Sequence, residues 1–137
     1  MDWHECIKRR TAKEAKPDYN KIKSAREVAK IKIESADALP EHLYIGKITL
    51  LYDALREYLE CIALEKGYKI YNHECYTAFL KEILGLSSEG DIFDVLRKAR
   101  NGINYYGKMP KQEEAVEILR KLKQLIDKFK QQNSTYL

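Results

Sequence analysis

The chain has 137 residues, of which 45% are hydrophobic and 34% are charged, and its formal net charge is +4. This length suits one domain with its own core, and the composition excludes a disordered chain. No apolar run approaches the ~20 residues that span a bilayer, and the start lacks a signal-peptide layout. We therefore expect a cytoplasmic protein that has no membrane association.

The positive charge lies at the beginning of the chain. Residues 1–34 hold ten Lys and Arg against six Asp and Glu, whereas residues 35–137 hold fifteen of each. Such a segment is either an electrostatic footprint for nucleic acid or the solvated face of a Lys-rich helix.

Three cysteines, Cys6, Cys61 and Cys75, are widely spaced and form no C-x-x-C pair. This spacing indicates neither a zinc knuckle nor a redox motif, so we expect three reduced thiols. His73 and Glu74 precede Cys75 directly, and adjacent helical positions do not point at one ion. The sequence thus predicts no metal site and no cofactor.

The first elements in chain order are predicted helices. A basic helical segment over about 2–15 ends before Pro17, and Asp18 is a suitable N-cap for a helix over 19–38. Pro40 fits the first turn of the longest helix, which has a wide apolar face and runs to Lys66.

The second half of the chain continues the helical pattern. Gly67 ends the long helix, and Asn72 is the expected N-cap of a helix over 73–84. A further helix leads to Gly107, and the last helix covers about 111–131.

These elements predict an all-α fold, an up-and-down antiparallel bundle of four to five helices. The basic segment at 1–17 precedes the bundle at 18–131, and residues 132–137 are expected to form a frayed tail.

The string Lys98-Ala99-Arg100-Asn101-Gly102-Ile103-Asn104-Tyr105-Tyr106-Gly107 is the main candidate site. Glycine and asparagine are unfavourable inside a helix, and a broken local rule often marks function. Arg100 is a forked phosphate binder, Asn101 and Asn104 supply amide groups, and Tyr105 and Tyr106 can stack on a base. Alternatively, Arg100 pairs with a carboxylate across the bundle while the tyrosines fill the core.

Charged residues also follow one side of the long helix. Asp53 lies three residues before Arg56 and four residues before Glu57, and these spacings place the residues along the same side. They form either a solvated salt-bridge face or a partner surface that holds the Arg100 guanidinium by a bidentate carboxylate contact.

The chain resembles the HEPN superfamily over about residues 19–130. The resemblance lies in the long-helix string Tyr52-Asp53-Ala54-Leu55-Arg56-Glu57, the connection from Gly67 to His73, and a helix that ends in an Arg-Asn motif followed by Tyr-Gly. It implies a HEPN-like bundle and a homodimer. Many HEPN proteins are metal-independent endoribonucleases, others are partners of small nucleotidyltransferases in toxin–antitoxin pairs, and some are inactive scaffolds.

The motif departs from the family at one position. Tyr105 stands where the family has its catalytic histidine. A tyrosine has a reference pKa near 10, so only about one in a thousand is ionised at pH 7. His-dependent cleavage is therefore not the leading expectation, whereas phosphate binding by Arg100 is unaffected by this change.

We therefore expect a protein that binds RNA or a nucleotide and is the toxin-like partner of a nucleotidyltransferase. Its ligand-binding residues are Arg100, Asn101, Asn104 and Tyr106, and its supporting residues are Asp53, Arg56, Glu57 and His73. One alternative is an endoribonuclease with Arg100 and either Tyr105 or His73 as catalytic residues. The other is an inactive dimeric scaffold.

Overall fold

The computed structural model describes residues 1–134, with side chains described up to Gln132. Over these residues the chain is mostly helical, which confirms the prediction of an α-helical bundle, and it adds one two-stranded sheet. The elements are α1 (Trp3–Lys8), β1 (Ala12–Glu14), α2 (Tyr19–Ala38), α3 (Tyr44–Glu65), β2 (Tyr68–Ile70), α4 (His73–Ala78), η1 (Phe79–Ile83), α5 (Ser87–Tyr106) and α6 (Gln112–Ser134).

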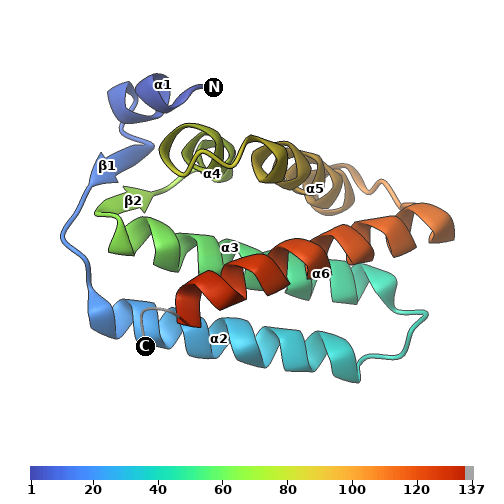
Figure 1. The fold of residues 1–137 in the computed structure, drawn as a ribbon. Coiled ribbons are helices and arrows are strands. Elements are labelled where there is room, and N and C mark those ends of the chain that lie inside the picture. Colours follow the sequence, from blue (N-terminus) through green and yellow to red (C-terminus); the bar gives the residue numbers. More distant parts are fainter. Residues whose placement is uncertain (135–137) are drawn as a thin grey trace.

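The long helix α3 lies at the centre of the bundle. Helices α2 and α6 pack along it, and α4 and α5 cover its remaining side (Figure 1). Twelve residues of α3 are buried, on more than one face, as expected of a helix enclosed by neighbours. The helix therefore presents side chains to α2, α5 and α6.

Helix ends follow the predicted capping residues. The Asp18 carboxylate accepts from the Lys21 N–H at 3.1 Å, and the Asn72 side chain accepts from the Glu74 N–H at 2.8 Å. Gly67 adopts φ 89° directly after the last turn of α3, the left-handed conformation that glycine tolerates best.

Two helix boundaries differ from the prediction. Helix α3 begins at Tyr44 instead of Pro40, because residues 40–43 form a turn in which the Leu43 N–H donates to the Pro40 carbonyl. The expected helix over 73–84 is α4 followed by the π-helical turn η1.

The segment before α2 is not a single helix over 2–15. It forms α1 and then β1, which pairs antiparallel with β2 in the register Ala12↔Ile70 and Lys13↔Lys69. The alternation of this short ladder buries Ala12 and Ile70 against the bundle. A helix was predicted over 2–15 because a three-residue strand gives almost no periodic pattern of its own.

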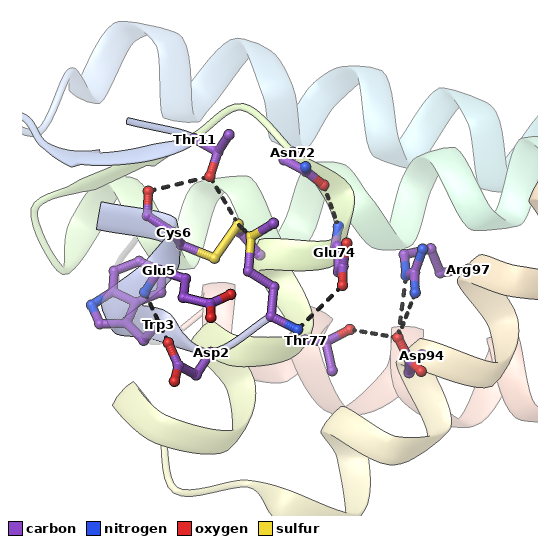
Figure 2. Close-up of polar contacts among 12 residues, drawn as sticks. Asp2, Trp3, Glu5, Cys6, Thr11, Asn72, Glu74, Thr77, Asp94 and Arg97 are labelled. Atoms are coloured by element: carbon purple, nitrogen blue, oxygen red, sulfur yellow. Dashed lines mark hydrogen bonds and ion pairs between the residues drawn. A yellow bond between two sulfur atoms is a disulfide. The ribbon is translucent and has the colours of Figure 1, made fainter. Parts of the chain in front are cut away.

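The expectation of three reduced thiols is wrong. Cys6 of α1 and Cys75 of α4 form a disulfide across 69 positions of sequence (Figure 2). Cys61 is a buried free thiol. Burial raises the pKa of the Cys61 thiol to about 12. The amino group of Met1 also pairs with Glu74 at 3.3 Å, so α1 is fastened to α4 at two points.

No helix within residues 1–134 is long and apolar enough to cross a membrane. Helix α6 continues through Ser134, and residues 135–137, where the rest of the frayed tail was expected, lie outside the described part.

Candidate functional site

Arg100 lies on the side of α5 that faces α3. Its Nη2 is 3.6 Å from Oδ1 of Asp53, and its guanidinium carbon is 5.3 Å from the centre of the Tyr52 ring. The side chain is 17% exposed, and its Nε is buried without a hydrogen-bond partner. Arg100 is thus brought to Asp53 by a single ion contact and not by a bidentate pair.

The other supporting residues on α3 have different partners. Arg56 donates to Glu60 at 3.0 Å, and Glu57 accepts from Lys32 of α2 at 3.0 Å. Lys32 also lies 3.9 Å from Asp53. Lys32 and Arg100 therefore share the Asp53 carboxylate, one at each oxygen, while Arg56 and Glu57 make no contact with Arg100.

His73 reaches the same cluster from the first turn of α4. Its Nδ1 is 3.1 Å from the hydroxyl oxygen of Tyr52, whose ring lies beside Arg100. Burial and the positive charges of Arg56 and Arg100 lower the pKa of His73 to about 4. The imidazole is therefore neutral at pH 7, and a pKa this low makes it a weaker base than an ordinary histidine.

Tyrosines in this cluster stay protonated. Burial raises the pKa of Tyr52 far above its usual range, against the opposing effect of Arg100. Burial also raises the pKa of Tyr76, whose hydroxyl is buried and has no hydrogen-bond partner within residues 1–134. Both phenols can serve as hydrogen-bond groups, but neither is a base at neutral pH.

Arg97 is a member of the cluster that sequence reasoning missed. It lies one turn before Arg100 and donates through Nε and Nη2 to Asp94, which also accepts from Thr77 of α4 (Figure 2). The i, i+3 spacing of Asp94 and Arg97 was the available signal. Arg97 is satisfied by this carboxylate, in contrast to Arg100.

Two residues of the motif lie beyond Arg100 along α5. Asn104 lies one turn after Arg100 on the same side of the helix, and it is exposed. Tyr105 is 71% exposed and is not among the groups that contact Arg100 or His73. The structure thus brings His73, and not Tyr105, to the Arg100 cluster.

The remaining motif residues border a cavity of about 640 Å³ between α5 and α6. Asn101, Gly102 and Tyr106 line it together with Lys98 and Lys108. The motif therefore has two sides: one holds Arg100 against α3, and the other opens onto this cavity.

The two glycines of the motif differ. Gly107 has φ 60° and ends α5 in the left-handed conformation. A methyl group at Gly102 would meet only the Lys108 side chain, at 3.7 Å, which is ordinary contact. Packing therefore does not require glycine at position 102.

The cluster holds Arg100 beside one carboxylate, that of Asp53, together with His73 and Tyr52. Residues 1–134 contain no group of three or more His, Cys, Asp and Glu side chains arranged around a common point. Arginine side chains next to a neutral histidine and protonated tyrosines are suited to phosphate recognition through hydrogen bonds.

Comparisons with protein families, with curated proteins and with solved structures found no match to this chain.

Proposed function

We propose that this chain binds RNA or a nucleotide and that Arg100 contacts a phosphate group. The observation that supports this most is the unsatisfied guanidinium. Arg100 has five N–H donors but makes no hydrogen bond among the described residues, and its Nε is buried. A buried donor without an acceptor is rare and costly, and a phosphate oxygen would give the Arg100 guanidinium an acceptor.

Neighbouring groups fit the same ligand. Asn104 lies on the Arg100 side of α5 and is exposed, so its amide can donate to a phosphate or a base edge. On the cavity side, Lys108 supplies positive charge beside Asn101 and the Tyr106 ring, with Lys98, which pairs with Asp94 at 2.9 Å, and Glu114 also in the lining. A phosphate on the Arg100 side and a base or sugar on the cavity side would use both sides of the motif.

A homodimer with a HEPN-like arrangement is part of this proposal. Tyr105, Tyr106 and Met109 are 71%, 76% and 71% exposed at the turn from α5 to α6. Large apolar side chains gathered in this way favour a protein partner. The HEPN resemblance of residues 19–130 adds a nucleotidyltransferase, in a toxin–antitoxin pair, as a second partner.

A metal-independent endoribonuclease is the second candidate function, and the position of His73 favours it. His73 is neutral at pH 7 and is linked to Arg100 through Tyr52. In such a reaction His73, as a weak base, takes the proton of a ribose 2′-hydroxyl, the 2′ oxygen attacks phosphorus, and the 5′ oxygen leaves with a proton from water. Arg100 would stabilise the charge on the phosphate.

Binding of labelled RNA and of mononucleotides tests the first proposal. Arg100→Ala should weaken binding at least 10-fold, and Arg100→Lys should recover only part of it because the forked donor geometry is lost. Arg120→Ala is the matched control, since Arg120 is an exposed arginine paired with Glu117 on α6. Equal affinity of wild type and Arg100→Ala, with both proteins folded, would contradict the proposal.

Cleavage is measured separately, without added metal. Loss of cleavage in His73→Gln but not in Tyr105→Phe would support the nuclease function. No cleavage of several RNAs by the wild type, with binding retained, would leave phosphate binding alone.

A further inference from the structure

The two-stranded sheet at one end of the bundle has an excess of cations. We call residues 8–16 and 66–71 the basic ribbon; they hold seven Lys and Arg and a single carboxylate, that of Glu14. Among the residues that the structure describes, none of these seven cations forms an ion pair with a carboxylate. Elsewhere in the chain, ion pairs are frequent, as at Arg26, Lys32 and Arg97.

The register of the ribbon concentrates this charge on its outer side. Lys13 and Lys69 lie directly opposite each other, one step along the ladder from the buried pair Ala12 and Ile70. Side chains alternate between the two sides of a strand, so both lysines point away from the bundle. Like charges directly opposite each other destabilise a strand pair, and a bound anion would remove that cost.

Tyr71 completes the outer side of the ribbon. Its N–H donates to the Thr11 carbonyl at 2.7 Å, which extends the ladder by one residue, and the residue is 52% exposed. The ammonium groups of Lys13 and Lys69 lie 5.5 Å and 5.3 Å from the centre of its ring. Lys13, which can donate to the phenolate oxygen, and Lys69 lower the pKa of Tyr71.

We propose that the outer side of the basic ribbon binds single-stranded nucleic acid, with a base stacked on Tyr71 and phosphates contacted by Lys13 and Lys69. An exposed aromatic ring between cations is the combination that sequence-tolerant single-strand binding requires. A duplex offers no unstacked base for the ring, so single strands are the expected ligand. This site does not depend on the proposed role of Arg100.

The ribbon is held in place for such a role. The Cys6–Cys75 disulfide fastens α1, just before β1, to α4, just after β2. Trp3 packs on Tyr68 of β2 at 5.2 Å between ring centres, beneath the ladder. The ribbon lies at the opposite end of the bundle from the turn between α5 and α6 (Figure 1). One strand could therefore contact the ribbon without occupying the cavity beside Tyr106.

Fluorescence anisotropy of the oxidised, full-length chain with labelled 12-nucleotide RNA and DNA tests this proposal. Tyr71→Leu should weaken binding of single strands about 10-fold or more, and Tyr71→Phe should keep nearly wild-type affinity because the ring remains. A blunt duplex of the same sequence should bind more weakly than either strand. Comparison of the RNA and DNA affinities shows whether the ribbon prefers ribose or deoxyribose.

The salt dependence gives a second readout. Each lost phosphate contact reduces the slope of log K against log salt by about 0.7 for a single strand, so Lys13→Ala/Lys69→Ala should reduce it by about 1.4. Lys23→Ala/Lys30→Ala is the matched control, because both lysines are exposed on α2 and neither belongs to the ribbon. Its slope should equal that of the wild type.

The outcomes separate the two sites. Unchanged oligonucleotide affinity and salt slope in the folded ribbon variants would overturn the ribbon proposal, whatever Arg100→Ala does. Lost mononucleotide binding in Arg100→Ala, with ribbon variants unaffected, would leave the Arg100 proposal standing alone. Tighter binding to anionic phosphatidylglycerol vesicles than to either oligonucleotide would also overturn the assignment, because the ribbon would then be a lipid-binding surface.

Discussion

The hydroxyl oxygen of Tyr52 lies 3.1 Å from Nδ1 of His73, while the Arg100 guanidinium lies over the ring of the same tyrosine. One side chain of α3 thus joins the first turn of α4 to the last turns of α5. The histidine is neutral because burial and nearby arginines oppose its charge. The stability of the folded chain should therefore depend on pH through this histidine.

His73 should make the folded state less stable as the pH falls from about 6.5 to about 4. In this window the unfolded chain binds a proton at His73, with its pKa near 6.5, whereas the folded chain with a pKa of about 4 does not. The expected loss is about 1–2 kcal/mol, less than the full shift implies because the ring is only partly buried. Urea unfolding at pH 7 and pH 4 measures it.

His73→Gln should lose less stability than the wild type over that pH interval. His42→Gln is the matched control, since His42 is exposed and precedes α3. A pH dependence in His73→Gln identical to that of the wild type would show that His73 does not bind the proton concerned.

The two glycines of the motif should respond in opposite directions to alanine. Gly102→Ala should raise the free energy of unfolding by about 0.5–1 kcal/mol, because the site has room for a methyl group and alanine favours a helix. Gly107→Ala should lower it by about 1 kcal/mol, because φ is 60° there. Thermal unfolding of both variants measures this, and destabilisation by Gly102→Ala would be the contrary result.

Local features of the fold could be predicted from the sequence. Asp18, Asn72 and Gly67 end or begin helices through contacts within three residues, so their roles follow from residue type and position. The helix over residues 87–106 and its end at Gly107 could be predicted for the same reason, because both depend on residues close together in the sequence.

Long-range features could not be predicted. The ribbon joins strands of three residues from distant parts of the chain, and such short segments give no usable periodicity. The spacing of Asp53 and Arg56 places both along one side of α3 but does not say that Asp53 meets Arg100 while Arg56 meets Glu60. With three cysteines, no sequence rule selects the pair that bonds.

Reduction of the Cys6–Cys75 disulfide should destabilise the protein. The bond closes a loop of 69 positions, and its loss releases about 4 kcal/mol of chain entropy in the unfolded state. Urea midpoints measured with and without a reductant should differ for the wild type. A thiol assay on the unfolded, unreduced chain should find one free thiol of three, that of Cys61.

Cys6→Ser/Cys75→Ser is the control for this experiment. Its unfolding midpoint should match that of the reduced wild type and should not respond to the reductant. Three free thiols in the purified wild-type chain, or a midpoint unaffected by reduction, would contradict the bond.

Removal of the Asp53 charge should strengthen binding of an anionic ligand at Arg100. Asp53 lies 3.6 Å from the guanidinium and competes with a phosphate for the same donors. Asp53→Asn should therefore raise the affinity for RNA or a mononucleotide about 3- to 10-fold, which corresponds to about 1 kcal/mol. Glu57→Gln removes the same charge one turn away, where the carboxylate pairs with Lys32 instead of Arg100. The affinity should rise more in Asp53→Asn than in Glu57→Gln, and this gain should disappear in Asp53→Asn/Arg100→Ala. That result would locate the ligand at Arg100. Equal gains in the two single variants would show only a general effect of net charge.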